Sequence, residues 1–465
     1  MDADKEPVEG PELLLALDRA ASRPQRGALH EQLEQSLREQ IRDGRLAPGS
    51  RLPSSRGLAS QLGISRGVVL EAYAQLVAEG YLTATQGAPT RVASAPAAER
   101  PPVPASSLRS RWAYDFDPGL PDLAAFPRTA WMRSLRAVVR DAAFDDLGPG
   151  DPRGSPELRN ALMSYLGRAR GAAPEPEHTL ISSGFTQGFA ILCRTLKDRG
   201  LDRIAVEYPG FEPHRLIAER AGLEPVAVRV DELGIDVAEL VAARCEVVVV
   251  TPAHQFPTGA LLASERRAAL LDWAEDVDGL IVEDDYDSEL RYDRVPVGAL
   301  QGLAPERVCQ IGSTSKRLVP GLRIGWVLSP SWLTGALTYE KALADGGSPV
   351  LEQLALAELI TRGELDRHLR RMRIRYRRRR DALVSALSTA IPGARIGGVA
   401  AGLFVPVTLP GRVDEQAVVN AAATQGIGLG RLGGDGRGGL LIGFGNMSEP
   451  RLQAGVRLLA EHCIP

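Results

Sequence analysis

One short polar stretch has the residue types that chemistry on a phosphorylated aldehyde needs. Ser313, Ser315, Lys316 and Arg323 contribute two hydroxyls, one amine and one guanidinium within a span of eleven residues. A desolvated lysine can attack an aldehyde, whereas an arginine cannot do so under these conditions. The hydroxyls and the guanidinium suit a phosphate held beside that amine. Only four of the 55 basic residues are lysines, so Lys316 is not compositional background, and its neighbours argue against the alternative of a solvated loop lysine.

This stretch lies between two apolar runs, 307–312 and 324–328, which indicates a polar turn between two strands. Ser-x-Ser-Lys followed by Gly-Leu-Arg-Ile-Gly, at 313–325, resembles the pyridoxal phosphate (PLP) segment of fold type I aminotransferases. The resemblance implies PLP as the cofactor, held as a Schiff base on Lys316. The other cofactor contacts that it implies in this stretch are Ser313, Ser315 and Arg323.

A turn of small residues, 182–188, offers further contacts for a phosphate. It opens an expected helix that runs to Lys197. The first amides of a helix have no partner within the helix, so those near Phe185 and Thr186 can bind an anion. By itself this signal is weak. Beside the lysine segment, it makes Phe185 and Thr186 candidate cofactor-binding residues.

The acidic stretch Glu-Asp-Asp-Tyr-Asp, 283–287, follows an apolar run. Asp284 and Tyr286 are two apart on an extended segment, so their side chains lie on one face. A buried carboxylate can keep the pyridine nitrogen of PLP protonated, and a phenol can bond to its 3-oxygen. The alternative for these carboxylates, without histidines nearby, is a magnesium-like site. We expect no metal, because Lys316 favours the PLP interpretation.

Two further segments are assigned mainly through the resemblance. It places Phe211 as the ring that stacks on the cofactor, and a core phenylalanine is the alternative. The segment 251–259 ends in Pro-Thr-Gly, before which many aminotransferases have an asparagine that donates to the cofactor's 3-oxygen. Phe256 stands there instead. His254 could take the polar role, or it could be a structural loop histidine.

The sequence departs from aminotransferases at two other positions. Amino-acid aminotransferases hold the substrate carboxylate with an arginine in an Arg-Leu-x-Phe segment, and Leu441 occupies that place in 441–444. Without this arginine a carboxylate loses a charge-assisted bidentate contact, so turnover of ordinary amino acids is disfavoured. Pro149 stands where a tyrosine usually precedes Gly-Asp-Pro and reaches the neighbouring subunit's phosphate in aminotransferase dimers. Phosphate affinity is therefore expected to be lower.

The N-terminal part predicts three helices and a hairpin. Leucine or isoleucine recurs every four residues over 29–41, which predicts an amphipathic helix that ends at Gly44. A second helix is capped near Ser54 or Ser55 and is broken at Gly63. Ser65 caps a third helix that runs to about 79, and 81–92 reads as a two-stranded wing. Two short helices joined by a tight glycine turn form a helix-turn-helix.

Charge supports DNA binding by this part. Five arginines between positions 45 and 91 face only two glutamates, a local charge of +3 in a chain of net charge −3. The segments 52–56, 58–66 and 72–76 are similar to the GntR signature, and the whole chain resembles the MocR/GabR subfamily of GntR transcription regulators over 28–450. A three-helix protein-interaction module is the alternative. The residues expected to contact double-stranded DNA are Arg51, Arg56, Ser65, Arg66 and the wing glycine Gly87.

The chain is expected to contain a segment 1–27, a winged helix at 28–92, a Pro-rich linker at 93–111 and an aminotransferase-like domain at 112–465. Short apolar strands alternate with helices from 112 onward, which predicts an α/β fold with a mainly parallel sheet covered on both faces, followed by a smaller α+β subdomain. Ligands of such sheets bind at the carboxyl ends of the strands, and Lys316 follows one such end.

Composition agrees with this organisation. The length of 465 residues and the 44% hydrophobic content suit two or three domains, each with a core. The four scattered cysteines suit buried thiols in a reducing cytoplasm, and no apolar run is long enough to span a membrane. The arginine-rich stretch 367–380 carries arginines all around its expected helix, so a solvated or interface helix is favoured over a nucleic-acid patch.

These patterns lead to one hypothesis and two alternatives. The hypothesis is a homodimeric transcription regulator that senses a small amine, an amino acid or PLP itself through its PLP-binding domain, and that is not an enzyme with multiple turnovers. The first alternative is an active aminotransferase that carries a DNA-tethering domain. The second is a repressor whose large domain serves only as a dimerisation scaffold.

Overall fold

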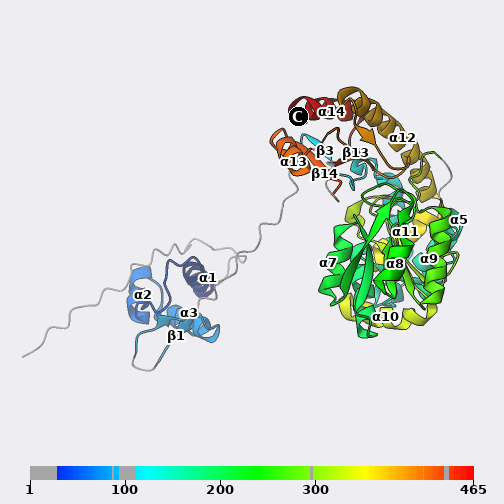
Figure 1. Ribbon diagram of the computed structural model, residues 1–465. Helices are drawn as coiled ribbons and strands as arrows, with labels where there is room; N and C mark the ends of the chain where they lie inside the picture. The colour runs from blue at the N-terminus through cyan, green and yellow to red at the C-terminus, as the bar shows by residue number, and fades with distance from the viewer. Residues whose placement is uncertain are drawn as a thin grey trace, which may run out of the picture. The chain divides into compact units, whose positions relative to one another are not determined.

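The computed structural model describes residues 29–85, 88–93, 112–293, 297–411, 413–433 and 439–464. The chain forms two compact units, residues 1–108 and 109–465, and the helices and strands of each are labelled in Figure 1. Gly87, which we expected in the wing, lies outside the described residues.

The first unit has the expected helices and wing strands. Its elements are α1 (Leu29–Arg42), α2 (Ser55–Leu62), α3 (Arg66–Ala78), β1 (Leu82–Thr83) and β2 (Arg91–Val92), of which the two strands pair antiparallel. Ser54 and Ser65 cap α2 and α3 by accepting hydrogen bonds from the amides of Gly57 and Val68. Gly63 ends α2 in the left-handed conformation, with φ of 62°. These contacts confirm the caps and the glycine turn.

The second unit is built on an eight-stranded sheet with strand order β4-β11-β10-β9-β8-β5-β6-β7. β10, β9, β8, β5 and β6 run parallel, and β11 pairs antiparallel with both β10 and β4. The sheet is therefore mainly parallel, as expected. Its strands are β4 (Thr179–Ser182), β5 (Arg203–Tyr208), β6 (Glu224–Asp231), β7 (Gly234–Ile235), β8 (Val247–Val250), β9 (Leu280–Asp285), β10 (Val308–Ser313) and β11 (Gly325–Leu328).

Helices cover both faces of this sheet because its strands are apolar on both sides. In β8, Val247 and Val249 pack in one core with helices α6, α7 and α10, whereas Val248 and Val250 pack in another with α8 and α9. Helices α5 and α11 pack beside α8 and α9 on the second face. The bounds are α4 (Arg128–Asp141), α5 (Pro156–Arg170), α6 (Phe185–Asp198), α7 (Glu212–Arg220), α8 (Val237–Ala243), α9 (Ser264–Asp276), α10 (Ser331–Asp345) and α11 (Val350–Thr361).

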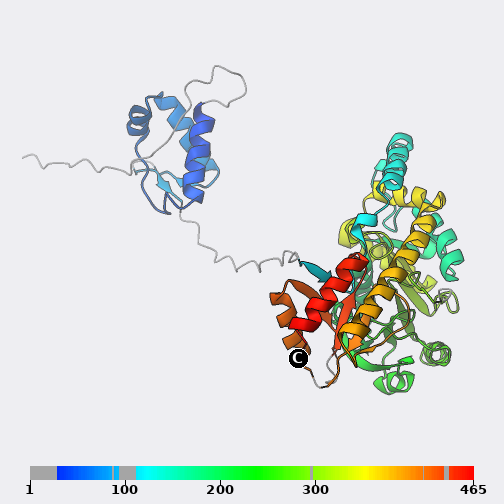
Figure 2. The same ribbon diagram turned by 90° about the horizontal axis from the view of Figure 1, so that it is seen from above.

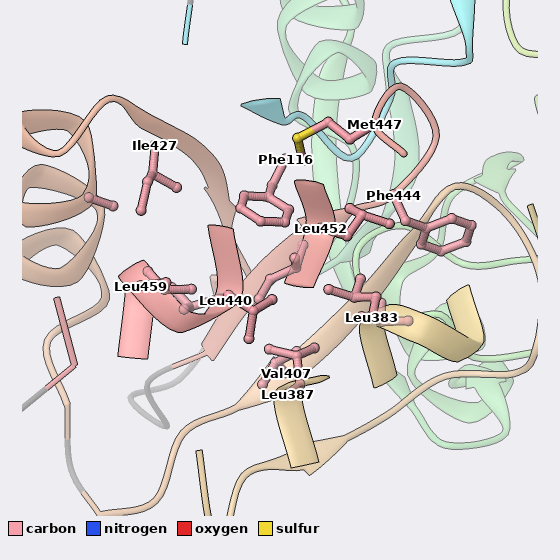
Figure 3. Packing of buried hydrophobic residues seen from close by; sticks show 14 of the residues in the cluster. Phe116, Leu383, Leu387, Val407, Ile427, Leu440, Phe444, Met447, Leu452 and Leu459 are labelled. Atoms are coloured by element: carbon pink, nitrogen blue, oxygen red, sulfur yellow. The ribbon is translucent and has the colours of Figure 1, made fainter. Parts of the chain in front are cut away.

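A smaller subdomain follows, built on a sheet of order β12-β13-β15-β14-β3. Helices α12 and α14 lie side by side on it (Figures 1 and 2), and Phe116 of β3 packs with leucines of α12 and α14 in its core (Figure 3). The segment before the large sheet thus completes the subdomain after it. The elements are β3 (Tyr114–Phe116), α12 (Glu364–Ala390), β12 (Arg395–Ile396), β13 (Phe404–Thr408), α13 (Glu415–Thr424), β14 (Ile427–Arg431), β15 (Gly439–Gly443) and α14 (Glu449–His462).

Three expectations from composition can be compared with this fold. The four cysteines are buried and form no disulfide. Within the described ranges, no helix is long and apolar enough to cross a membrane. Most arginines of α12 face solvent, but Arg379 is buried and its Nη2 donates to Asp122 Oδ2 over 2.8 Å. α12 is thus an arginine-rich helix that is solvated on one side and packed on the other.

Candidate functional site

A cavity of about 310 Å³ lies at the carboxyl ends of the parallel strands. All nine residues that we expected to bind the cofactor line it: Phe185, Thr186, Phe211, Asp284, Tyr286, Ser313, Ser315, Lys316 and Arg323. They come from segments at or just after the ends of β4, β5, β9 and β10, with Arg323 just before β11. Strands that run in the same direction end at the same edge of a sheet, which is why segments distant in sequence meet there.

Lys316 lines this cavity, and its Nζ donates a hydrogen bond to the backbone oxygen of Gly119. The segment that carries Gly119 follows β3 and also lines the cavity with Asp117 and Pro118. A side chain at Gly119 would come within 2.8 Å of Lys316 Nζ. No local sequence pattern predicts this contact, because it joins residues that are 197 positions apart.

Asp284 is held from behind by a buried histidine. His214 Nε2 lies 3.0 Å from Asp284 Oδ2, whereas Asp284 Oδ1 is buried and has no hydrogen-bond partner among the described residues. Burial raises the pKa of Asp284, and the His214 hydrogen bond opposes that shift. An unpartnered oxygen on a carboxylate that lines the cavity fits a protonated pyridine nitrogen. We did not identify His214 from sequence, although it lies one helical turn after Phe211.

The other end of the cavity is suited to an anion. Ser313, Ser315, Thr186 and Arg323 line it, where α6 begins after Gly184. Arg323 has a left-handed backbone with φ of 51°, which costs a residue with a β-carbon about 1 kcal/mol or more. Its Nη2 donates to the backbone oxygen of Ser183 over 2.5 Å. The strained turn thus directs the guanidinium to the start of α6, so charge and free amides converge there.

Aromatic rings form the apolar wall. Phe211 is 36% exposed, so it is not a core residue, and its ring meets Phe256 edge-to-face at 5.7 Å. Phe256 lines the cavity at the position of the aminotransferase asparagine. Tyr286 also lines it, and its hydroxyl donates to the backbone oxygen of His254 over 2.6 Å.

His254 lies behind the wall and not among the lining residues. Its Nδ1 is 2.9 Å from Asp287 Oδ2, and its ring stacks on Phe404 at 4.8 Å. A side chain on Gly402 would come within 2.3 Å of the ring. The sequence left two roles open for His254, a polar contact to the cofactor and a structural role in the loop. These contacts favour the structural role, because His254 contacts Tyr286 and Phe404 without lining the cavity itself.

The residue after Lys316 is the centre of a buried ion-pair network. Arg317 Nε donates to Glu289 Oε1 over 2.7 Å, and its Nη2 donates to Asp285 Oδ2 over 3.2 Å. Arg170 reaches the same Asp285 oxygen over 3.3 Å, and the Tyr165 hydroxyl donates to Glu289. Arg317 also donates to the backbone oxygens of Ser313 and Asp285. The network therefore joins the lysine turn to the end of β9.

The acidic stretch is engaged by protein groups. Glu283 accepts hydrogen bonds from the amides of Leu300 and Gln301. Asp284 pairs with His214, and Asp287 pairs with His254. Asp285 accepts from the guanidiniums of Arg170 and Arg317. Over the described ranges, no group of three or more His, Cys, Asp or Glu side chains could hold a metal ion. Each of these four carboxylates thus has a partner within the protein.

Leu441 and Pro149, the two positions at which the sequence departs from aminotransferases, lie in different places. Leu441 is buried in β15, where a side chain on Gly430 would meet Leu441 Cβ at 3.2 Å and Pro118 Cγ at 3.5 Å. Among the described residues that line the cavity, the only cations are Lys316 and Arg323. Pro149 lies outside it, beside a separate hollow of about 490 Å³ formed with residues 346–350.

The first unit places four expected DNA contacts on its surface. Arg51, Arg56, Ser65 and Arg66 are all exposed. Arg56 lies in the first turn of α2, and Ser65 and Arg66 begin α3. Arg66 Nε donates to Ser55 Oγ over 3.2 Å, which holds the arginine between the two helices. A positive cluster at the start of the second helix of a helix-turn-helix suits the major groove.

The fold and the site define the class of this protein. It is a winged helix joined to a fold type I aminotransferase-like domain. Family models agree with both parts: residues 29–92 match bacterial regulatory proteins of the gntR family, and residues 127–429 match aminotransferase class I and II, a class that typically binds PLP. The structure of a kynurenine aminotransferase from Pyrococcus horikoshii matches with a TM-score of 0.69 and 26% identity, covering 76% of this chain and 91% of that one.

Curated relatives share the whole arrangement. The chain is 34% identical over 433 residues to the pyridoxine biosynthesis transcriptional regulator PdxR of Corynebacterium glutamicum, covering 91% of this chain and 93% of that protein. It is 32% identical to the probable rhizopine catabolism regulatory protein MocR of Rhizobium meliloti (96% and 95%) and 33% to the regulator TauR of Rhodobacter capsulatus (86% and 88%). The chain belongs to the MocR-type group of the GntR family, and it is a helix-turn-helix transcriptional regulator.

The buried network predicts a large effect of removing its central cation. Arg317→Met leaves Glu289 and part of Asp285 without their partner in the core, which should destabilise the large unit by about 3–5 kcal/mol. Urea unfolding followed by tryptophan fluorescence measures this change. The matched control is Arg367→Met, which removes an exposed ion pair to Glu364 and should leave the midpoint nearly unchanged. Equal midpoints for both variants would contradict the role of the network.

Glu283 predicts a pH dependence of stability. Burial, and after it the Asp285 charge, raise its pKa to about 7 against the opposing effects of Arg170 and of the amides of Gln301 and Leu300. Because the pKa of Glu283 is higher in the folded protein, its contribution to the free energy of unfolding is fully present below about pH 4.5. That contribution is lost as pH rises through about 7. The glutamine of Glu283→Gln cannot ionise. The free energy of unfolding of this variant should therefore increase by about 3 kcal/mol relative to that of the wild type across this pH range.

Denaturant unfolding at a series of pH values between 4.5 and 8 measures the difference between the two proteins. The control is Glu246→Gln at an exposed position, which should keep the wild-type slope. If Glu283→Gln also keeps that slope, Glu283 does not titrate in this range.

Proposed function

We propose that this regulator binds PLP on Lys316 and that PLP itself is the signal that changes its grip on operator DNA. The observation that carries the proposal is the convergence of an amine, an anion-binding end and an unpartnered carboxylate oxygen in one cavity of about 310 Å³. Arg323, Ser313, Ser315 and Thr186 would hold the phosphate, Asp284 the ring nitrogen and Phe211 the ring face. Bound PLP supplies an aldehyde carbon, with which the Lys316 nitrogen condenses as one water leaves.

The charges of the cavity favour PLP as the signal over an amino acid. With Lys316 joined to the aldehyde and Arg323 on the phosphate, none of the described lining residues remains as a cation for a substrate carboxylate. Leu441 supplies an apolar side chain where aminotransferases have that arginine. The name of the Corynebacterium relative, which refers to pyridoxine biosynthesis, is consistent with this choice.

The segment that follows the linker gives a route from this cavity to the DNA-binding unit. Lys316 donates to Gly119 O, and three residues later Asp122 accepts hydrogen bonds from Arg375 and Arg379 of α12. A Lys316 nitrogen joined to an aldehyde would keep at most one of its hydrogens, so its hydrogen bond to Gly119 O would be altered. Since this segment is continuous with the linker, its release or capture would change how the winged helix is tethered.

Arg51, Arg56, Ser65 and Arg66 are proposed to contact double-stranded operator DNA, and Gly87 remains a sequence-based candidate. Their exposure and the positive start of α3 support this. We further propose a homodimer, so that two winged helices engage two half-sites. The working aminotransferase remains the second candidate, because Lys316 and the eight other residues expected to bind PLP all line one cavity.

The covalent step has a direct test. Protein incubated with PLP and then reduced with borohydride should carry one phosphopyridoxyl group on Lys316, found by peptide mass spectrometry, and PLP should change the affinity for operator DNA. Lys316→Ala should lose both effects. The control Lys197→Ala removes an exposed lysine paired with Asp202 and should keep both. An unmodified Lys316 contradicts cofactor binding, whereas a modified Lys316 with unchanged DNA affinity contradicts only the sensing role.

Multiple turnovers with amino donors and 2-oxo acids at enzyme-like rates would instead support the working aminotransferase.

The DNA contacts are tested by band shift with labelled operator fragments. Arg66→Ala should lose sequence-specific binding, because it removes a charge at the start of α3 that can read a guanine. The control Arg45→Ala removes an arginine of the same unit that pairs with Asp43 and should retain the specific complex. Specific binding by Arg66→Ala would contradict the placement of α3 in the major groove.

A further inference from the structure

The outward face of α3 carries a leucine where a groove-reading helix usually carries polar side chains. The residues that α3 buries are Val69, Ala72, Tyr73 and Leu76. On the opposite side Gly67, Leu70 and Ala74 are exposed, at a spacing that aligns them in one stripe. Leu70 is 48% exposed. Single exposed leucines are common on proteins, so the position of Leu70 on this face is what gives it meaning.

The neighbouring polar side chains of α3 are directed to partners within the protein. Gln75 Nε2 donates to Glu79 Oε1 over 2.9 Å, and Glu71 Oε2 lies 3.8 Å from His30 Nδ1 on α1. The small residues on either side of Leu70 leave it as the bulky side chain at the middle of the stripe. A side chain at Gly67 would meet only Ser65 Oγ, at 3.8 Å, so lack of space does not explain the glycine.

Charge indicates what covers this stripe. Arg66 stands at the start of the same face and Arg56 in the first turn of the adjacent α2, so an anionic surface is the fitting partner. Leu70 lies four residues after Arg66, roughly 6 Å along the helix axis, which is about two base-pair steps. In the major groove an apolar side chain can recognise a base by contact with the 5-methyl group of thymine.

We propose that Leu70 determines part of the operator specificity by packing against a thymine methyl group, about two base pairs from the base that Arg66 contacts. This rests on the proposed placement of α3 in the major groove. Cytosine would present an amino group that Leu70 cannot satisfy, so it is rejected at that position. Gly67 and Ala74 let the helix approach closely enough for the contact.

The test removes only the methyl group. The full-length protein selects a duplex from a random-sequence pool, and each thymine of that duplex is then replaced singly by deoxyuridine. At one thymine per half-site the wild type should bind about fourfold more weakly, the effect of one buried methyl group. Leu70→Ala should bind the two duplexes equally. The control Leu29→Ala, an exposed leucine at the start of α1, should keep the fourfold difference.

A second variant separates specificity from folding. Leu70→Gln offers a bidentate partner for adenine, so it should select adenine in place of that thymine while still binding DNA. A selected duplex with no methyl-sensitive thymine, or a fourfold difference that persists in Leu70→Ala, overturns the assignment of Leu70. A pool that yields no duplex overturns the DNA-binding proposal on which it rests.

Discussion

The site depends on one buried guanidinium. Arg317 bonds to two carboxylates, Glu289 and Asp285, and to the backbone oxygens at the ends of β9 and β10. It therefore fixes where the chain leaves two neighbouring strands, and Lys316 and Asp284 are positioned as a consequence. A charge in the core is tolerated only when its donors are satisfied, so the turn has little freedom to rearrange without unpairing several groups. The indole of Trp326 lies 5.1 Å from the same guanidinium and closes the network against the sheet.

Close backbone contacts hold the segment 117–120 against the smaller subdomain. A side chain on Gly443 would collide with the backbone oxygen of Asp117, and one on Gly445 with that of Leu120. The segment after the linker thus lies directly on β15 on one side and against Lys316 on the other. The residues that line the cavity on this side, Asp117 to Gly119, precede the large sheet in the chain and belong to the segment that carries β3.

Much of the fold followed from local patterns. The serine caps, the Gly63 turn and the four-residue leucine spacing defined α1 to α3 because helix ends and amphipathic faces are set by nearby residues. The two-sided apolar strands predicted the parallel sheet, and the rule that ligands bind at carboxyl ends of strands placed Lys316 and Asp284 at a common edge, whereas Phe211 was assigned through the resemblance. Sequence reasoning did not find His214, Gly119 or Arg317, whose partners lie far away along the chain. From the sequence, Arg317 in particular would be taken for a surface arginine, because the carboxylates that pair with it, Asp285 and Glu289, lie in another segment of the chain.

The sequence by itself determined the two-part architecture, the chemistry of the lysine turn and the missing arginine at Leu441, because these depend on residue types and short spacings. Only the tertiary structure decided which groups hold that turn, which oxygen of Asp284 is left unpartnered, and that His254 supports the wall from behind. The physical reason is that hydrogen bonds and burial join residues separated by up to hundreds of positions, and no local pattern specifies such pairs. The exposure of Leu70 was also decided by the tertiary structure. From sequence, a leucine in a helix is expected to be buried, and only the packing of α1 and α2 shows which face of α3 remains exposed.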